Sequence, residues 1–265
     1  MTNKKFMFRK QTLPDPRDEP LLTARGIRLA PAAAPIDFAV GKGEIVGLAG
    51  LEGHGQDAFI QVLCGLHRPQ AGRVELVGKD DRSVPVTDFA KAAAQGLAYL
   101  PRDRRTTGVF GGLSVFDNFA IAALPDHARL GVVARTGLKA KLAHFTRELS
   151  MVYGSPDASI GTLSGGNQQK VLLARWLARE PRVMLMNDPT RGVDLGTRMK
   201  LYEVFRRLAA DQGIPLVVLS TEIEEILQLC HRVLVFREQA VFAELDRTSM
   251  TMDRVIAAMF GQEAA

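Results

Sequence analysis

The sequence lacks several features that define other classes of protein. Among its 265 residues are only two cysteines, Cys64 and Cys230, and its five histidines form no H-x-x-x-H pair. We therefore expect buried thiols and neither a disulfide framework nor a metal site of that spacing. No window approaches the roughly 18 consecutive apolar residues of a membrane helix, and the first residues lack the apolar core of a secretory signal. These absences predict a cytosolic protein.

The excess of positive charge is small and dispersed. The chain has 34 Lys and Arg against 29 Asp and Glu, and its 46% hydrophobic and 24% charged residues are ordinary for a globular protein. This composition excludes disorder, collagen and coiled coil. The only dense basic stretch is Arg102, Arg104 and Arg105. No basic stripe marks a nucleic-acid partner, so we expect none.

Short apolar runs alternate with helical patterns along most of the chain, which predicts a mainly parallel sheet covered by helices. Residues 1–19 are polar and rich in proline, as in a tail or linker. The expected strands are Glu44–Ala49, Leu97–Leu100, Val183–Asn187 and Leu216–Ser220, followed by a hairpin of Arg232–Phe236 and Ala240–Leu245. The expected helices are Gln56–Cys64, Asn167–Arg179, Thr197–Ala210 and Met252–Phe260.

The middle of the chain, Ser114–Tyr153, has a different pattern. Two amphipathic helical stretches flank a break at Pro125–Gly137. This pattern predicts a helical insert within the α/β core.

A glycine-rich loop follows the first buried strand and precedes a helix, the context of a phosphate-binding G-x-x-x-x-G-K-[ST] loop. Its glycines would let backbone N–H groups surround a phosphate. Gln56 stands at the lysine position and Asp57 at the Ser/Thr position, so we expect nucleotide binding weakened by about two to four orders of magnitude. A purely structural glycine turn is the alternative. The candidate phosphate-binding residues are Gly50, Gly53, His54, Gly55, Gln56 and Asp57.

A second motif, LSGGNQQK at Leu163–Lys170, is very similar to the signature of ATP-binding-cassette (ABC) ATPases. A serine and two glycines at a helix N-terminus form an anion site. The resemblance implies that this segment contacts the γ-phosphate of an ATP molecule held by an opposite subunit. The residues so implied are Leu163, Ser164, Gly165, Gly166, Asn167 and Gln168.

The segment after the next strand strengthens the resemblance. Asn187–Thr190 (NDPT) stands where the family has D-E-P-T, and Arg191–Asp194 completes T-R-G-V-D, which places Asp194 in the D-loop. These variants resemble the C-terminal half of tandem ATPase subunits of ribose-, galactose- and xylose-type importers, and Pro101–Arg104 is similar to that family's P-E-D-R segment.

The resemblance implies a fold and its divisions. The expected fold is a P-loop NTPase of the ABC ATPase type, α/β, with a mainly parallel sheet, flanking helices, an N-terminal antiparallel β portion and a helical insert. The ATPase domain would span residues 20–265, with a helical subdomain at about 103–166.

Departures from the family pattern cluster at one site. Asn187 replaces the aspartate that would hold Mg²⁺, Asp188 stands at the catalytic glutamate position, and Thr221 stands at the switch-histidine position. No glutamine stands at the usual position near Pro101 and Arg102, where the resemblance implies a metal and water ligand. Asp57 could instead act as a direct Mg²⁺ ligand, so Asn187 and Asp57 are weak metal candidates.

We therefore predict an ATP-binding subunit of a sugar-type ABC importer. Its own ATP and Mg²⁺ site would be degenerate, with little independent hydrolysis, while its signature completes the site of a second cassette with an intact phosphate loop. The resemblance further implies transmembrane permease subunits, an indirect periplasmic sugar-binding partner and a peripheral position on the inner face of the membrane. Arg102–Thr106 and the helical insert would face the permease, unless these arginines lie in a solvated loop.

Two other functions remain to be weighed. A catalytically inactive, regulatory or binding pseudo-ATPase would have the same fold. A soluble cassette ATPase of DNA repair or translation is disfavoured, because the 109 residues that separate Gly55 from Ser164 leave no room for a coiled-coil insertion.

Overall fold

The computed structural model describes residues 19–124, 128–129, 132–133 and 135–262. The predicted tail or linker therefore lies outside the described residues except for Glu19, as does part of the break at 125–137. The strands are β1 (Pro20–Arg28), β2 (Ile36–Gly41), β3 (Ile45–Gly50), β4 (Ala71–Val77), β5 (Ser83–Pro85), β6 (Leu97–Leu100), β7 (Ala128–Arg129), β8 (Val132–Val133), β9 (Val183–Asn187), β10 (Leu216–Leu219), β11 (Arg232–Arg237) and β12 (Ala240–Asp246). The longer helices are α1 (Gln56–Leu63), α2 (Phe89–Ala94), α3 (Val115–Ala120), α5 (Arg135–Glu148), α6 (Gly165–Leu177), α7 (Leu195–Ala210), α8 (Ile223–Leu229) and α9 (Met252–Met259). The short ones are η1 (Arg104–Gly108), η2 (Ile121–Ala123) and η3 (Ile160–Thr162).

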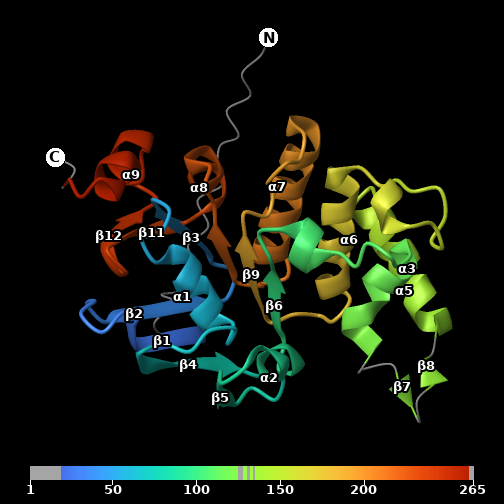
Figure 1. Cartoon of the computed structure of the whole chain (residues 1–265), viewed down its shortest axis with the longest axis horizontal. Coiled ribbons are helices and arrows are strands. Elements are labelled where there is room, and N and C mark those ends of the chain that lie inside the picture. The colour runs from blue at the N-terminus through green and yellow to red at the C-terminus, as the bar shows by residue number, and fades with distance from the viewer. Residues whose placement is uncertain (1–18, 125–127, 130–131, 134, 263–265) are drawn as a thin grey trace.

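A six-stranded sheet forms the centre of the molecule, with strand order β12-β11-β3-β10-β9-β6 (Figure 1). All neighbours pair in parallel except β12, which pairs antiparallel with β11. Every residue of β6, β9 and β10 is buried. Both faces of the sheet are therefore covered, as a parallel sheet requires.

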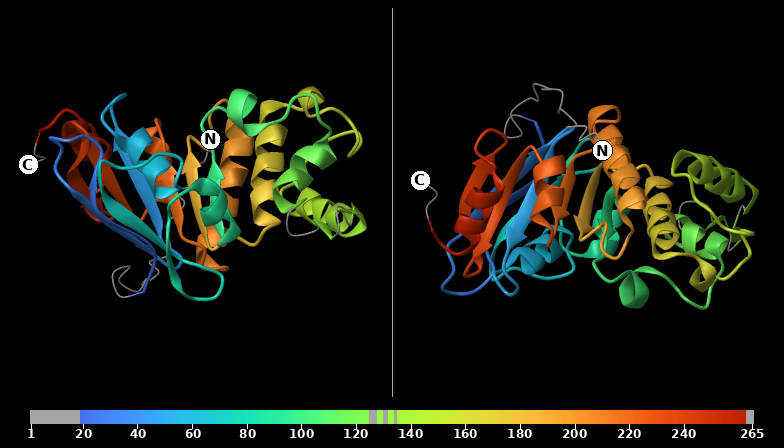
Figure 2. Two further views of the ribbon diagram at one scale, coloured as in Figure 1. Left: turned by 60° about the horizontal axis from the view of Figure 1, so that its bottom comes forward. Right: turned by 90° about the horizontal axis from the view of Figure 1, so that it is seen from above.

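The two faces of this sheet belong to two separate hydrophobic clusters. Alternate residues point to opposite faces, so Met184 and Val218 join one cluster while Leu185 and Val217 join the other. Helices α6 to α9 cover the first face, and α1 with a four-stranded antiparallel sheet, β2-β1-β4-β5, covers the second (Figure 2).

Helix α1 lies between the two sheets. The Phe59 ring contacts Phe38 of β2 at 5.7 Å and Phe236 of β11 at 5.2 Å between centroids. Packing on both sides fixes the direction of α1 and hence of the loop that precedes it.

Most elements predicted from the sequence are confirmed. Val183–Asn187 and Leu97–Leu100 form strands with the predicted bounds, and the C-terminal hairpin is present. The predicted N-terminal antiparallel portion is the four-stranded sheet β2-β1-β4-β5, which precedes the helical middle in the chain. Cys64 and Cys230 are buried free thiols, as predicted. None of the helices in the described part of the chain is both long and apolar enough to cross a membrane.

The predicted insert contains α3 and α5, and α3 packs against both α5 and α6. These helices lie at one end of the molecule, beyond β6 (Figure 1). Helix α5 begins at Arg135, inside the predicted break, so that prediction placed the second helix too late. The division into residues 20–265 and 103–166 stays a prediction.

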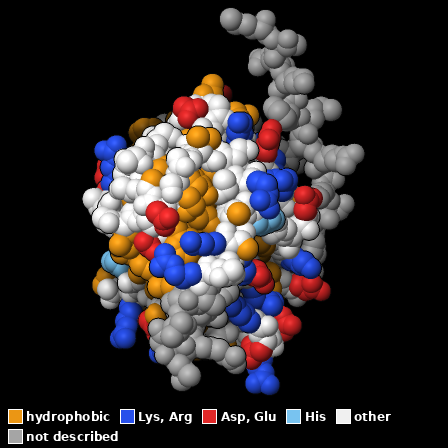
Figure 3. All heavy atoms as spheres, turned by 90° about the vertical axis from the view of Figure 1, so that its right-hand side faces the viewer, with side chains coloured by type: hydrophobic (Ala, Val, Ile, Leu, Met, Phe, Trp, Pro, Cys, Tyr) orange, Lys and Arg blue, Asp and Glu red, His pale blue; other side chains and the backbone are white. Residues whose placement is uncertain are grey.

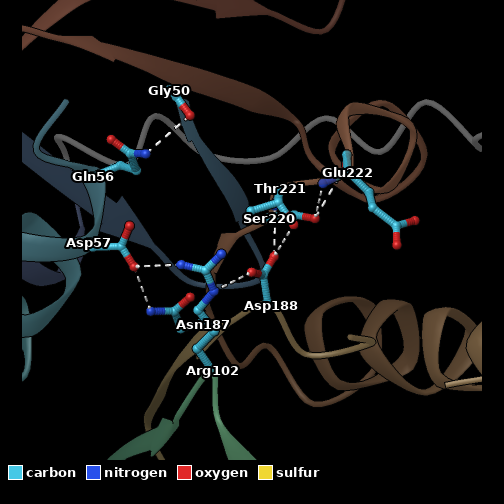
Figure 4. Close-up of polar contacts among 9 residues, drawn as sticks. All are labelled: Gly50, Gln56, Asp57, Arg102, Asn187, Asp188, Ser220, Thr221 and Glu222. Carbon is cyan, nitrogen blue, oxygen red and sulfur yellow. Dashed lines mark hydrogen bonds and ion pairs between the residues drawn. The ribbon is translucent and has the colours of Figure 1, made fainter. Parts of the chain in front are cut away.

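The ends of four parallel strands gather at one edge of the central sheet. Strands β3, β10, β9 and β6 are neighbours, so their carboxyl ends bring Gly50, Thr221, Asp188 and Arg102 to the same edge (Figure 4). Ligand sites of parallel α/β sheets form in this position.

Candidate functional site

The glycine loop between β3 and α1 has a backbone that only glycine adopts easily. Gly53 has φ 83° and Gly55 has φ 112°, and Gly55 directly precedes α1. A Cβ atom on Gly55 would lie 2.9 Å from the Cα of Gln239, which belongs to the β11–β12 turn. The loop is therefore closely packed against that turn.

Gln239 fixes this packing with two hydrogen bonds. Its backbone N–H donates to the carbonyl of His54 at 2.9 Å, and its side-chain Nε2 donates to the carbonyl of Gly53 at 2.5 Å. Gln239 could not be predicted as a loop contact from the sequence, because only its position in the turn of a predicted hairpin sets it apart from other glutamines.

Gln56, at the lysine position, turns back into the loop. Its side chain is 4% exposed, and Nε2 donates to the carbonyls of Gly50 at 3.1 Å and Leu51 at 2.9 Å (Figure 4). The amide thereby bonds the inside of the loop without adding a charge. Position 56 holds no cation for a phosphate.

Asp57, in the first turn of α1, faces the end of β9. The Nδ2 of Asn187 donates to Oδ1 of Asp57 at 3.2 Å. Asn187 is 2% exposed, and its Oδ1 has no hydrogen-bond partner among the described residues. The carboxylate of Asp57 therefore orients the amide of Asn187 with its N–H₂ toward the site.

Asp188 lies next along the chain, in the left-handed region at φ 45°. Its Oδ1 accepts hydrogen bonds from the backbone N of Thr221 at 2.7 Å and from Oγ1 of Thr221 at 3.0 Å. The residue at the glutamate position is thus bonded to the residue at the switch-histidine position. Both belong to one cluster at the carboxyl ends of β9 and β10.

The guanidinium group of Arg102 lies between these carboxylates. Its Nε is 3.0 Å from Oδ2 of Asp188, and one NH atom is 4.0 Å from Oδ1 of Asp57 (Figure 4). The contact between Nε and Oδ2 does not meet hydrogen-bond geometry, and the contact with Asp57 is too long for a hydrogen bond. Arg102 therefore pairs with both acids electrostatically.

The placement of Arg102 corrects one expectation. Its side chain is 32% exposed and reaches back to the ends of β9 and α1, so Arg102 is not a fully solvated loop residue, while a permease-facing position for Arg102–Thr106 stays a prediction. Arg102 lies 45 positions after Asp57 and 86 positions before Asp188 in the sequence. Contacts over such separations leave no periodic pattern from which they could be predicted.

The residues at the Mg²⁺ position do not fit that ion. Mg²⁺ prefers oxygen ligands, usually one or two carboxylates, in octahedral geometry. Here Asn187 presents its N–H₂ to Asp57, and a guanidinium cation is already there. The guanidinium of Arg102, paired with Asp188 and 4.0 Å from Asp57, competes with a divalent ion for both carboxylates. No group of three or more His, Cys, Asp or Glu side chains suited to a metal occurs among the described residues.

The signature segment forms a second, separate cluster. Ser164 is the N-cap of α6, and its Oγ accepts from the backbone N of Asn167 at 3.4 Å and from Nδ2 of Asn167 at 3.2 Å. Gln168 donates to the carbonyls of Ile160 and Leu163. Ser164 is exposed, and its Oγ already accepts from the N–H of Asn167 in the first turn of α6.

Helix α6 begins directly beside α7. A Cβ atom on Gly166 would lie 2.9 Å from Cγ2 of Thr197, so only glycine allows this approach. Asp194 caps α7 by accepting from the backbone N of Thr197 at 3.0 Å, and this hydrogen bond lowers the pKa of Asp194. The signature and the D-loop are thereby brought together.

Arg104 joins these two segments. It donates to the carbonyl of Arg191 at 2.6 Å, and its guanidinium lies against Gly165, where an added Cβ would be 2.4 Å from one NH atom. Burial and the neighbouring Arg105 lower its pKa. Arg102 and Arg104, two residues apart, thus connect the loop cluster with the signature cluster.

The fold is that of an ATPase cassette of the ABC type. The solved structure of the ATP-binding cassette MJ1267 superposes with a TM-score of 0.74 at 18% identity, over 90% of this chain and 98% of that one. A dimeric cassette, MJ0796 bound to ADP and Pi, gives a TM-score of 0.72 at 18% identity, over 85% of this chain and 98% of that one.

The chain belongs to the ABC transporter family, whose sequence pattern matches residues 33–191. It is 35% identical over 92% of its length to a ribose import ATP-binding protein of Rhizobium meliloti, of which it covers 48%. It is 39% identical over 87% of its length to a ribose import ATP-binding protein of Streptomyces avermitilis, of which it covers 45%. The chain therefore spans about half the length of the curated relatives it matches.

Proposed function

We propose that this chain is the ATP-binding subunit of a sugar importer and completes the ATP site of a second cassette. Its own site is degenerate, and its signature acts on a nucleotide held by the phosphate loop of that second cassette. The sugar class rests on the names of its relatives, ribose import ATP-binding proteins. The relatives are about twice as long as this chain, and a cassette equivalent to their N-terminal half is the proposed source of the intact loop.

The observation that carries the proposal is the asymmetry between the two clusters. At the loop, position 56 holds a neutral glutamine, and Asn187 donates a hydrogen bond to Asp57. At the signature, Ser164 caps an exposed helix N-terminus, which is an anion site that needs no side-chain cation. The first arrangement disfavours Mg·ATP, and the second favours the phosphate of a neighbouring molecule.

The helical end of the molecule is the proposed surface for transmembrane permease subunits. Figure 3 views this end, where hydrophobic side chains gather beside lysine and arginine. Phe110, Leu113 and Val152, which belong to the middle of the chain, are exposed large apolar residues. Docking there would hold the chain on the inner face of the membrane and link it, through the permease, to a periplasmic sugar-binding protein.

The test is ATP hydrolysis by a complex of this chain with a cassette that has an intact G-x-x-x-x-G-K-[ST] loop. Ser164→Arg should lower the turnover of the complex at least tenfold, since a bulky side chain covers the N–H groups of α6. Phosphate release measures the effect, and co-sedimentation confirms that the complex still forms.

Thr251→Arg is the matched control. Thr251 is an exposed N-cap of α9 that accepts from the backbone N of Arg254, so the substitution removes an equivalent helix cap elsewhere. Its complex should hydrolyse ATP at the unchanged rate. Equal rates for the Ser164→Arg complex and the unchanged complex would overturn the proposal.

A regulatory or binding pseudo-ATPase is the second candidate. The ion pairs of Arg102 with Asp57 and Asp188 favour a pseudo-ATPase, because these residues do not form a suitable Mg²⁺ site. Co-purification separates the two: an importer subunit brings down a second cassette and a permease, whereas a regulatory protein brings down neither.

A further inference from the structure

We propose that Arg102 replaces the missing loop lysine as the phosphate-binding cation of this chain's own site, which then takes a nucleoside triphosphate without Mg²⁺. This inference assigns a ligand to the degenerate site. It rests on the proposed function only in taking that ligand to be a nucleotide.

The first support is the position of the guanidinium. Arg102 follows β6 and reaches between the first turn of α1 and the end of β9, beside the glycine loop (Figure 4). Its side chain is 32% exposed, so one part stays open while the rest is held by Asp57 and Asp188. A phosphate cradled by the loop would approach this exposed part.

The second support is that the two carboxylates occupy only part of the guanidinium. Its buried Nε is paired with Oδ2 of Asp188 at 3.0 Å, and one NH atom is 4.0 Å from Oδ1 of Asp57, beyond hydrogen-bond distance. The terminal N–H groups on the exposed side are therefore the ones a phosphate would meet. An arginine presents these groups as a fork that matches two phosphate oxygens.

The third support is the number of charged groups in the cluster, which equals that of the family motif. Gln56, Asp57, Arg102, Asn187 and Asp188 carry one cation and two carboxylates. A loop lysine with Ser or Thr, glutamine, aspartate and glutamate at these positions carries the same number of each. The cation lost at 56 is present at 102, and the carboxylate lost at 187 is present at 57. The charges are redistributed rather than deleted.

The same rearrangement removes the need for a divalent ion. Asn187, 2% exposed, presents an amide N–H₂ where a carboxylate would face Mg²⁺, and its Oδ1 is unpartnered. Arg102 stands beside it as a resident cation. The β- and γ-phosphates would then be neutralised by the guanidinium, the backbone N–H groups of the loop and the N-terminus of α1.

The experiment measures binding, not hydrolysis, on the full chain. A non-hydrolysable ATP analogue is titrated by calorimetry in EDTA and in excess Mg²⁺, with inorganic tripolyphosphate as a second probe. We expect the dissociation constant in EDTA to lie within about threefold of that in Mg²⁺. Arg102→Gln should weaken binding of both probes in EDTA by about tenfold or more, and Arg102→Lys should weaken it less.

Arg105→Gln is the control, since Arg105 is an exposed arginine of the same segment, and it should leave binding unchanged. Circular dichroism checks that each variant is folded. Binding that requires Mg²⁺, binding unaffected by Arg102→Gln, or no binding in EDTA would each overturn the inference. None of these outcomes affects the proposed role of the signature, which the Ser164→Arg complex tests separately.

Discussion

Glu225, on α8 behind the site, is a carboxyl group 1% exposed. Burial raises its pKa above 4.5, although hydrogen bonds from Ser220 and Thr190 act in the opposite direction. The native state therefore binds this proton more tightly than the unfolded chain. The resulting stability is fully present below the unfolded pKa and is lost as pH rises through the folded pKa.

Glu225→Gln should remove this loss, because glutamine keeps the acceptor for Oγ1 of Thr190 and never ionises. Urea unfolding from below pH 4.5 to neutral pH measures the effect. The unchanged protein should lose stability along this range relative to the variant. Glu224→Gln, at an exposed position of the same helix, should behave like the unchanged protein, and identical pH profiles for Glu225→Gln and the unchanged protein would contradict the assignment.

The sequence predicts which site residues share an edge but not how their side chains pair. Asp57, Asp188 and Thr221 each follow a recognisable turn or strand end, so their proximity follows from a parallel sheet. The direction of Arg102 depends instead on two carboxylates brought close only by the folded sheet. The assignments of these residues to ATP binding stay predictions.

At the scale of elements, one buried ion pair ties the antiparallel sheet to the central one. Glu44, between β2 and β3, accepts from Nε of Arg232 on β11 at 2.7 Å, and Arg232 also donates to the carbonyl of Ala39 on β2. Glu44 is 5% exposed. Glu44→Ala should destabilise the fold by about 3 kcal/mol, because it leaves a mostly buried guanidinium with less compensation.

Glu244→Ala supplies the comparison. Glu244 on β12 accepts from the other side of the same guanidinium at 2.7 Å, but its side chain is 55% exposed. Its loss should cost less than about 1 kcal/mol. Urea denaturation of both variants measures the two losses of unfolding free energy. Equal losses would show that burial of Glu44 does not govern the strength of this contact.

Element type follows from the sequence more readily than sheet order does. Both-face burial makes β6, β9 and β10 continuous apolar runs, so each is recognisable as a strand. Because these strands are all apolar along their length, their sequences do not indicate which of them are neighbours in the sheet. β3 pairs with β10 and β11, far later in the chain, and nothing in their patterns distinguishes this order from another.

At the scale of the whole molecule, the two clusters make opposite demands on a homodimer. On the proposed function, two copies of this chain would each present the signature to a partner loop that has Gln56 in place of the lysine and Asn187 in place of the metal-binding aspartate. Phosphate release by the chain alone should therefore stay at background in Mg·ATP as the protein concentration rises. Release that increases with the square of concentration would show that the loop cluster works as it stands.

The converse experiment restores the loop cluster and leaves the signature alone. The variant Gln56→Lys/Asp57→Ser/Arg102→Gln/Asn187→Asp/Asp188→Glu/Thr221→His returns a loop cation, two carboxylates suited to Mg²⁺ and general-base chemistry, a neutral residue at 102 and a histidine at the switch position. Because Ser164 already caps an exposed helix N-terminus, this variant should hydrolyse Mg·ATP with a rate that rises with the square of concentration. Adding Ser164→Arg should abolish that activity. A folded, nucleotide-binding variant that stays inactive would mean that the signature cluster cannot complete a site in trans, and the asymmetry between the clusters would lose its functional meaning.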